Sequence, residues 1–150
     1  MADYPTLQLQ LVTLLGRKMD EEVYEVILPT TTGEISVFPG HESLVTMAKS
    51  GVIAVRRKKT DTNDALEYFA TSGGIIEIDS DRVRVLVDEA EHGDDIIEAE
   101  SEKALERALQ MRDNSADQVE LEKATQLIDR HQTRLKVAGL RRHQNRTKFK

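Results

Sequence analysis

The sequence contains no cysteine and no tryptophan, and it has only three residues each of proline, tyrosine and phenylalanine. The lack of cysteine excludes disulfide bonds, thiolate metal sites and cysteine nucleophiles. No run approaches the roughly 20 apolar residues of a membrane-spanning helix. The first residues also lack the basic-then-apolar pattern of a secretion signal. The 150 residues therefore fit one soluble domain, or a small domain with an appendage, whose core is built from Ile, Val and Leu.

Charge is distributed unevenly along the chain. From residue 130 to residue 150 there are eight lysine or arginine residues and no aspartate or glutamate, so this segment carries +8. The rest of the chain then holds 13 of the 21 basic and all 27 acidic residues, a net charge of −14. Such an uneven distribution of charge indicates that the C-terminal end binds an acidic partner.

Short hydrophobic runs separated by turn residues fill the first 90 residues. Leu7, Leu9 and Leu11 alternate with polar residues, which predicts a half-buried strand. Further strands are predicted at residues 23–28 (ended by Pro29), 35–38, 51–55, 65–71, 75–78 and 83–87. Many short strands without an intervening helix indicate an antiparallel β-sandwich or barrel. We therefore predict a β-sandwich domain over residues 1–90.

Residues 91–150 change to a helical period. Asp95 with Glu98 fits a capping box that opens one helix, and Ser115 with Gln118 fits a second, with Gly139 as its stop. Two helices of roughly 18 and 24 residues joined by a short turn would pack as an antiparallel hairpin. The prediction for residues 91–150 is thus a two-helix regulatory hairpin with a basic end.

The predicted apolar faces of these helices are narrow and rich in alanine. They comprise Ile97, Ser101, Ala104, Leu105, Ala108 and Met111 in the first helix, and Leu121, Ala124, Ile128, Leu135 and Ala138 in the second. Alanine buries little apolar area, so each contact stabilises weakly. We expect a hairpin held this lightly to be able to leave the sandwich and bind elsewhere.

The motifs of common enzymes and metal sites are absent. The four histidines show no i, i+4 pair for a helical metal site, and a nucleophile elbow, a phosphate-binding loop and a dinucleotide fingerprint are all missing. We therefore predict a non-catalytic protein without a bound metal.

The basic C-terminal end allows three interpretations. Nucleic acid would attract such a stripe, but the rest of the chain is strongly acidic and Phe149 is the only aromatic residue nearby. An acidic protein surface fits better, and a solvated tail without a partner stays open. As an alternative function, the chain would be a stand-alone β-sandwich binding module whose basic helical tail contacts an acidic partner. Its lack of tryptophan counts against a carbohydrate-binding version of that alternative.

Several segments resemble the ε subunit family of the F-type ATP synthases. The strongest likeness is in residues 32–46, TGEISVFPGHESLVT, which match the family's Gly-Glu…Pro-Gly-His…Leu…Thr segment. Residues 72–78 (SGGIIEI), 83–90 (VRVLVDEA) and 104–108 (ALERA) resemble later segments in the same order. Each motif alone is weak, but together they cover nearly the whole chain.

The resemblance implies a non-catalytic rotor subunit of the central stalk, with roles in ATP synthesis and proton transport. Its sandwich would dock on the γ subunit and the membrane c ring. Its hairpin would permit rotation when folded and inhibit ATP hydrolysis when extended along γ toward acidic loops of the catalytic β subunits. The α subunits of the same complex would be partners as well. The subunit would be peripheral, on the cytoplasmic face of a bacterial plasma (inner) membrane, because no transit peptide is seen.

The same resemblance suggests contact residues. Thr13, His41 and Thr46 would face γ, and Glu34 would face the c ring. The cations expected to reach acidic loops of the β subunit are Arg130, Arg134, Arg141 and Arg142.

One segment departs from the family pattern. Some bacterial members bind ATP on the folded hairpin through an Ile/Leu-Asp-x-x-Arg-Ala string. The aligned residues 96–101 are IIEAES, where Glu100 replaces the arginine and would repel a triphosphate. Arg130 and Arg134 could still supply positive charge, but we predict weak or absent nucleotide binding and no cofactor.

Overall fold

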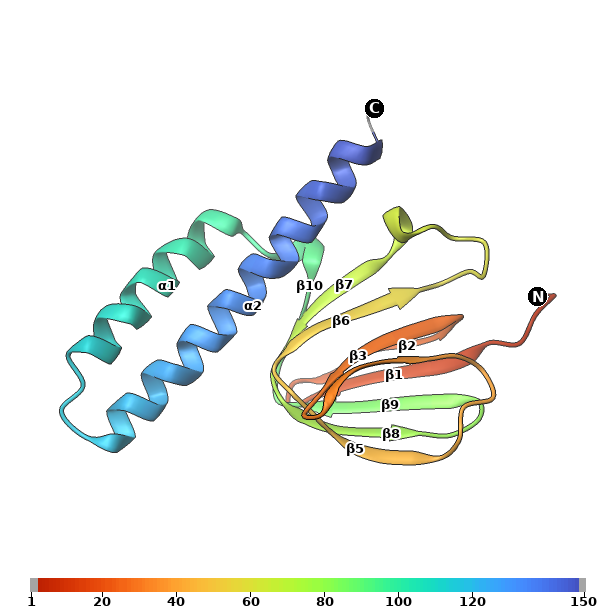
Figure 1. Ribbon diagram of the computed structural model, residues 1–150, viewed down its shortest axis with the longest axis horizontal. Coiled ribbons are helices and arrows are strands. Elements are labelled where there is room, and N and C mark those ends of the chain that lie inside the picture. Colours follow the sequence, from red (N-terminus) through yellow and green to blue (C-terminus); the bar gives the residue numbers. More distant parts are fainter. Residues whose placement is uncertain (1–2, 149–150) are drawn as a thin grey trace.

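Ten short strands build the first part of the chain, and two helices form an antiparallel hairpin beside them (Figure 1). The computed structural model describes residues 3–148. The strands are β1 (Leu7–Thr13), β2 (Gly16–Val23), β3 (Glu25–Thr30), β4 (Gly33–Val37), β5 (Leu44–Ala48), β6 (Gly51–Arg56), β7 (Glu67–Thr71), β8 (Gly74–Ile78), β9 (Arg82–Val87) and β10 (Ala90–His92). The predicted order, a β-sandwich followed by a helical hairpin, is confirmed.

The strands form one sheet that folds over on itself. Their order is β10-β7-β6-β3-β5-β8-β9-β1-β2, with β4 paired to β3 outside this path. Every strand pair is antiparallel except β1 with β9, which is parallel and places Leu9 beside Val83. The edges of the sheet are therefore β2 at one end and β10 at the other.

The alternation seen in the sequence explains which side chains fill the interior. Leu7, Leu9 and Leu11 of β1 are buried, while Gln8 and Gln10 between them are partly exposed. The same alternation on other strands completes a core of branched aliphatic side chains. Its largest fully buried members also include Leu28, Ile53, Ile76, Val23, Val26, Val37, Val55, Val83 and Val85.

Strands β2, β5 and β10 were not predicted. The edge strand β2 buries only Met19 and Val23, so its sequence lacks a hydrophobic pattern. The three-residue β10 exists because it pairs with β7. Pro29 was expected to end a strand, but it lies inside β3 and pairs with Glu34 of β4. The predicted domain boundary at residue 90 falls on the first residue of β10.

Both predicted helix starts are displaced. Helix α1 spans Glu98–Asp113, its N-cap Ile97 provides no side-chain bond, and Asp95 lies in the preceding 3₁₀ turn η2 (Gly93–Asp95). The predicted box of Asp95 with Glu98 is therefore wrong.

Helix α2 spans Gln118–Lys148, and its capping box is formed by other residues than predicted. Asp117 Oδ1 accepts from the Glu120 N–H at 2.9 Å, and Glu120 Oε2 accepts from the Ala116 N–H at 2.8 Å. Ser115 instead donates to the carbonyl of Met111. This reciprocal arrangement satisfies N–H groups that have no partner within the helix.

Helix α2 also continues through Gly139, where a stop was expected. A glycine inside a helix costs only about 1 kcal/mol. Contacts made beyond it, by Arg141 and Gln144, hold the last turns against the sandwich.

The main contacts between the hairpin and the sandwich are made by α2. Helix α1 packs on α2 and lies on its far side from the sandwich (Figure 1). Helix α2 packs on β7 and β6, and the helix–helix contact buries Ala108 of α1 and Ala124 of α2. Ile97 and Met111, predicted to face inward, are exposed. Neither helix, within residues 3–148, is long and apolar enough to cross a membrane.

Candidate functional site: the arginine row and the acidic strip

Three of the four arginines singled out in the sequence form a row along one face of α2, and the fourth, Arg142, lies beside Arg141 and turns toward α1. With about 100° per residue, positions 130, 134 and 141 fall within about 40° of one another around the helix. That face of α2 lies against the segment that leaves the sandwich, residues 89–98. We call Arg130, Arg134, Arg141 and Arg142 the arginine row.

Each arginine of the row is paired with a carboxylate of this segment. Arg130 lies 3.1 Å from Glu89, Arg134 lies 2.7 Å from Glu91, Arg142 lies 3.0 Å from Glu98, and Arg141 pairs with Asp94. We call Glu89, Glu91, Asp94 and Glu98 the acidic strip. The row and the strip run in the same direction along the chain, so their charges match in sequence order.

The pair of Arg134 with Glu91 is the most enclosed of the four. Its side chains are 17% and 31% exposed, the Arg134 Nη2 N–H donates to Glu91 Oε1 at 3.0 Å, and Nε lies 2.7 Å from Oε2 without forming a hydrogen bond. A charge-assisted hydrogen bond in a partly dry place makes a stronger pair than a solvated one. The pairs of Arg130 and Arg142 are about half exposed and are expected to contribute little.

Gly93 lets α2 approach the sandwich. It is buried, and an added Cβ would lie 2.7 Å from Arg141 Cδ, 3.1 Å from Val137 Cγ1 and 3.2 Å from the carbonyl oxygen of Tyr68. A larger residue would therefore push against both α2 and β7. The close helix–sheet contact depends on the missing side chain.

Gln144 fastens the C-terminal part of α2. Its amide Nε2 donates to the carbonyls of Leu66 at 2.9 Å and Asn63 at 3.2 Å, and the side chain is buried. These carbonyls belong to the 3₁₀ turn η1 (Asn63–Ala65) and its C-cap. Arg56 holds the same turn by donating to Asn63 Oδ1 at 2.8 Å.

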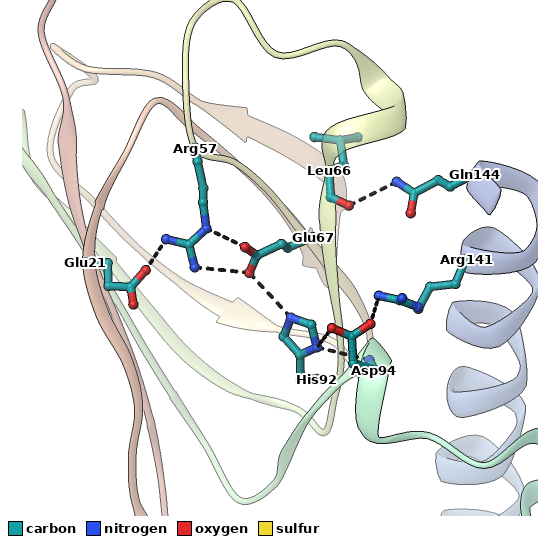
Figure 2. A network of polar contacts seen from close by, with 8 residues as sticks. All are labelled: Glu21, Arg57, Leu66, Glu67, His92, Asp94, Arg141 and Gln144. Carbon is teal, nitrogen blue, oxygen red and sulfur yellow. Dashed lines mark hydrogen bonds and ion pairs between the residues drawn. The ribbon is translucent and has the colours of Figure 1, made fainter. Parts of the chain in front are cut away.

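A chain of charged contacts joins the far edge of the sheet to α2 (Figure 2). Arg57 bridges Glu21 of the edge strand β2 and Glu67 of β7, the strand next to the other edge, which ties the two ends of the folded sheet together. His92 Nε2 lies 3.4 Å from Glu67 Oε2, and His92 Nδ1 accepts from the Asp94 N–H at 3.0 Å. Because Nδ1 accepts, the imidazole proton lies on Nε2, toward Glu67. Asp94 then pairs with Arg141 of α2.

Glu67 is ionised firmly in this network. Burial alone would raise the pKa of Glu67, but the hydrogen bond and charge of Arg57, helped by His92, outweigh burial and lower it. The hydrogen bond that Arg57 donates to Glu67 in turn raises the pKa of Arg57. A hollow of about 340 Å³ lies beside these groups, lined by residues of β2, β7 and β10. Within residues 3–148, no cluster of three carboxylate or histidine groups has a geometry that could hold a metal ion.

Comparison with known proteins identifies the family. The sequence model described as "ATP synthase, Delta/Epsilon chain, beta-sandwich domain" matches residues 6–93. The chain belongs to the ATP synthase delta/epsilon family. The ATP synthase epsilon chain of Trichodesmium erythraeum (strain IMS101) is 40% identical over 123 residues, covering 80% of this chain and 86% of the relative. That of Staphylococcus aureus (strain JH9) is 33% identical over 137 residues, covering 91% and 98%.

Solved structures agree with the fold. A chain of the Euglena gracilis mitochondrial ATP synthase, described as OSCP/F1/c-ring in rotational state 1, superposes with a TM-score of 0.74 at 21% identity, covering 87% of this chain and 79% of that chain. A chain of the Tetrahymena thermophila mitochondrial ATP synthase central stalk and c ring gives a TM-score of 0.55 at 11% identity, covering 91% and 98%. The arrangement of strands followed by helices is thus also present in chains of solved ATP synthases.

The residues that the delta/epsilon resemblance suggested on the sandwich are spread over two ends of it. Thr13 and Glu34 lie at the end of the sandwich from which the chain continues into the helices. Thr13 follows Val12, which pairs with Leu86 near the end of β9, and Glu34 pairs with Pro29 near the end of β3. His41 lies at the opposite end, next to Gly40, whose N–H donates to the Ser80 carbonyl.

Thr13 is buried, and its hydroxyl shapes the turn between β1 and β2. It donates to the Gly16 carbonyl at 3.1 Å and accepts from the Leu15 N–H at 3.2 Å. The side chains that this turn exposes are Leu14 and Leu15, which are 81% and 93% exposed. The surface at this position is therefore apolar.

Thr46 is half-buried on β5, and its exposed neighbours are apolar too. Val45 and Met47 point outward, and the register places Met47 beside Ile75 and Ile75 beside Leu86. Met47, Ile75 and Leu86 make an exposed apolar row across β5, β8 and β9. The sequence analysis predicted Thr46 as a contact residue and did not identify the exposed apolar row of Met47, Ile75 and Leu86.

Sequence reasoning also missed the acidic strip and Gln144. The signal for the strip was present, since residues 88–98 contain six acidic side chains. The signal was not used, because nothing in the sequence tells which carboxylates face α2. Of the predicted basic end, Phe149 and Lys150 lie outside the described residues.

Proposed function

We propose that this chain is the non-catalytic ε-type subunit of the central stalk of an F-type ATP synthase, and that its hairpin inhibits ATP hydrolysis when it leaves the sandwich. The observation that carries the proposal is the pairing of the arginine row with the acidic strip. Cations that an acidic partner would bind are held, in the folded chain, by carboxylates of the chain itself.

Inhibition is then an exchange of carboxylates. In the folded hairpin the row binds the strip, and in the extended hairpin it binds acidic loops of the catalytic β subunit. A ligand shifts such an equilibrium only by binding one state better than the other. Because the same arginines serve both states, the two pairings exclude each other.

The contact with the sandwich is weak enough for such an exchange. Its ion pairs of Arg130 with Glu89 and Arg141 with Asp94 are substantially exposed, and exposed pairs contribute about 0–1 kcal/mol each. Few large apolar side chains of α2 are buried, Ile128 and Val137 being the main ones. An equilibrium that is balanced within a few kcal/mol can be reversed by binding a partner.

Helix α2 is suited to stay helical after release. At ~1.5 Å per residue its 31 residues span about 46 Å. Its first turns carry acidic residues and its last turns basic ones, which complements the helix dipole. The capping box of Asp117 and Glu120 is local and does not depend on the sandwich.

The sandwich is proposed as the anchor. The apolar row of Met47, Ile75 and Leu86, with Thr46 and His41 nearby along the chain, is the surface offered to γ. The end that carries Glu34, Leu14 and Leu15 is the surface offered to the c ring. Through these partners the subunit is peripheral to the cytoplasmic face of a bacterial plasma membrane, where the complex couples proton transport to ATP synthesis.

We also propose that the folded hairpin binds ATP weakly or not at all. Arg130 and Arg134 already pair with Glu89 and Glu91, and Glu100 adds negative charge near the start of α1. A triphosphate would have to displace both carboxylates. Calorimetric titration of the isolated chain with MgATP is expected to give no micromolar binding, and micromolar affinity would overturn this part.

The exchange is tested in the reconstituted complex with two sets of variants. Replacing the arginine row by alanine breaks the pairs and also removes the inhibitory cations, so ATP hydrolysis should rise. Replacing Glu89, Glu91 and Asp94 by their amides breaks three of these pairs, those of Arg130, Arg134 and Arg141, but leaves the cations, so hydrolysis should fall. A control that replaces the exposed Lys58 and Lys59 by alanine should change neither.

Opposite effects of the two sets support the exchange. Equal effects in both sets, or no effect, would refute it. Co-purification of the wild-type chain with γ, α and β subunits tests membership of the complex separately, and failure to recover them would refute the stalk assignment itself.

A further inference from the structure

Strand β2 is an open edge of the folded sheet. Within residues 3–148 it pairs only with β1, and residues 17–23 make no backbone hydrogen bond to any other segment. Five of its eight residues are exposed, among them Arg17, Lys18 and Glu21. The outer side of β2 therefore offers alternate N–H and C=O groups to a strand of another chain.

The charges along β2 change sign at its buried residue Met19. Two cations, Arg17 and Lys18, precede it, and residues 20–22 (DEE) are all acidic. Native proteins often protect an open edge with charged side chains, which keep other edges away. The charges of β2 do not protect it against an antiparallel copy of itself, because the positive half of one strand then faces the negative half of the other.

Symmetry restricts how two copies of β2 can pair. Two chains related by a two-fold axis perpendicular to the sheet form an antiparallel strand pair, with both cores on the same side of one continuous sheet. Side chains alternate between the faces of a strand, so opposed residues must point to the same face. The axis therefore passes through one residue of β2, and residues at equal distances before and after it are opposed.

An axis at Met19 makes every opposed pair of charges attractive. It places Arg17 opposite Glu21 of the second copy and Lys18 opposite its Asp20, and the symmetry repeats both pairs. Every other axis from residue 17 to residue 22 falls on a charged residue and sets it against its own copy. Directly opposed unlike charges stabilise a strand pair, and like charges destabilise it. The charge pattern thus selects a single register.

We propose that the free chain forms a symmetric dimer through β2, with Met19 on the two-fold axis and the sheet continuous across both copies. The partner is a second copy of this chain. Strand β2 lies two strands away from β9, which carries Leu86 of the apolar row. The inference concerns chains outside the complex, and it holds whether or not the stalk assignment is correct.

The acidic residues of β2 already bind groups of their own chain. Asp20 accepts from Arg17 at 2.6 Å and from Gln8 at 2.7 Å, and Glu21 pairs with Arg57. An ionised carboxylate has about four acceptor sites, so each can bind a further cation from a second copy. Two paired strands of this length bury less than the ~1,200 Å² of a standard interface, which predicts a weak dimer. Salt screens exposed charges, so low salt should favour it.

The test is sedimentation equilibrium of the full-length chain at low salt, at concentrations up to about 1 mM, where weak interfaces associate. One variant carries Arg17→Glu and Lys18→Glu, and the other carries Asp20→Lys and Glu21→Lys. Each variant alone opposes four pairs of like charges, which should weaken the dimer at least about tenfold. An equimolar mixture of the two variants opposes only unlike charges and should dimerise again.

The matched control replaces the exposed Lys58 and Lys59, in the loop between β6 and β7, by glutamate. It changes the net charge as much as the first variant does, and it should keep the dimer. The second variant lowers the net negative charge, so general repulsion between chains does not account for its loss of dimer.

Carbodiimide crosslinking of the unaltered chain gives a second measurement. Isotope-labelled and unlabelled chains are mixed, so that a link between two copies is told from a link within one by mass. The expected product joins the Lys18 amine of one copy to the Asp20 carboxylate of the other.

Three results would overturn the proposal. They are an unaltered chain that stays monomeric up to about 1 mM, a dimer that withstands either charge reversal, and two folded variants whose mixture stays monomeric. If the variant with Asp20→Lys lacks a cooperative thermal transition, the crosslinks decide. A link from Lys18 to Asp20 between labelled and unlabelled copies supports the proposal, and its absence refutes it.

Discussion

Neutralising the acidic strip where it touches α2 should release the hairpin from the sandwich. The perturbation is the triple variant Glu89→Gln, Glu91→Gln, Asp94→Asn, which keeps side-chain shape and removes the charges opposite Arg130, Arg134 and Arg141. Glu98 is left unchanged, because it lies in α1 and its pair with Arg142 joins the two helices rather than the hairpin and the sandwich.

The expected size follows from the exposure of the pairs. The pairs of Glu89 and Asp94 are substantially exposed and are worth about 0.2–1 kcal/mol each. The pair of Glu91 with Arg134 is more enclosed, and its charge-assisted hydrogen bond is worth about 1.5–3 kcal/mol. The total of about 2–5 kcal/mol corresponds to a roughly 30- to 5,000-fold loss in the ratio of docked to released chains.

Because the sequence has no cysteine, two can be introduced at the exposed residues Lys59 of the β6–β7 loop and Asn145 of α2 and labelled for fluorescence energy transfer. Transfer between them reports this change, since release moves α2 away from the β6–β7 loop. The control triple Glu100→Gln, Glu102→Gln, Glu106→Gln changes the net charge equally on exposed side chains of α1 that form no ion pair within the described residues. Energy transfer should fall in the first triple and stay unchanged in the second. Equal transfer in both triples at low salt would refute the view that ion pairs hold the hairpin.

Three further predictions concern single residues. Gln144→Glu places a carboxylate against two backbone carbonyls, so it should release the end of α2, seen as faster amide hydrogen exchange there, whereas the same change at the exposed Gln132 should not. Gly74→Ala brings a Cβ to 1.9 Å from the Leu86 carbonyl oxygen and should unfold the sandwich, which thermal unfolding would detect. Gly93→Ala should weaken only the docking of the hairpin, which energy transfer would detect while the sandwich stays folded. Glu67→Gln should lower stability on the order of 1 kcal/mol at pH 7. Because the pKa of Glu67 is lowered on folding, this contribution is present above the unfolded value and lost as the pH falls through the folded one, so urea unfolding of the variant should depend less on acid pH.

Most of the sandwich could be predicted from local patterns. Leu7, Leu9 and Leu11 alternate because one face of β1 is buried, and that alternation is visible in the sequence. The strands that escaped prediction lack it. Strand β10 has three residues and exists only because β7 presents an unpaired edge, and β2 is polar because it lies at the other edge of the sheet.

Helix ends were predicted less well, since capping residues compete for the same role. At the start of α2, Ser115 and Asp117 are both suitable caps by residue type, and only the path of the chain decided that Asp117 is the cap. Asp95 is equally suitable before α1, but it lies in the 3₁₀ turn η2 and does not cap that helix. Gly139 looked like a stop because glycine often ends helices, but tertiary contacts beyond it, at Arg141 and Gln144, extend α2 to Lys148.

The order of residues alone determined the β-rich first part, the two helices and the concentration of positive charge at the end of the second, because period and composition are local properties. Which carboxylates pair with those positive charges was decided only by the tertiary structure. The pairing of β10 with β7 directs Glu89, Glu91 and Asp94 along one face of α2, and the absence of a side chain at Gly93 lets the helix come close enough to reach them. Which carboxylate opposes which arginine depends on the geometry of a sheet edge and a helix face, and no local pattern encodes that distance.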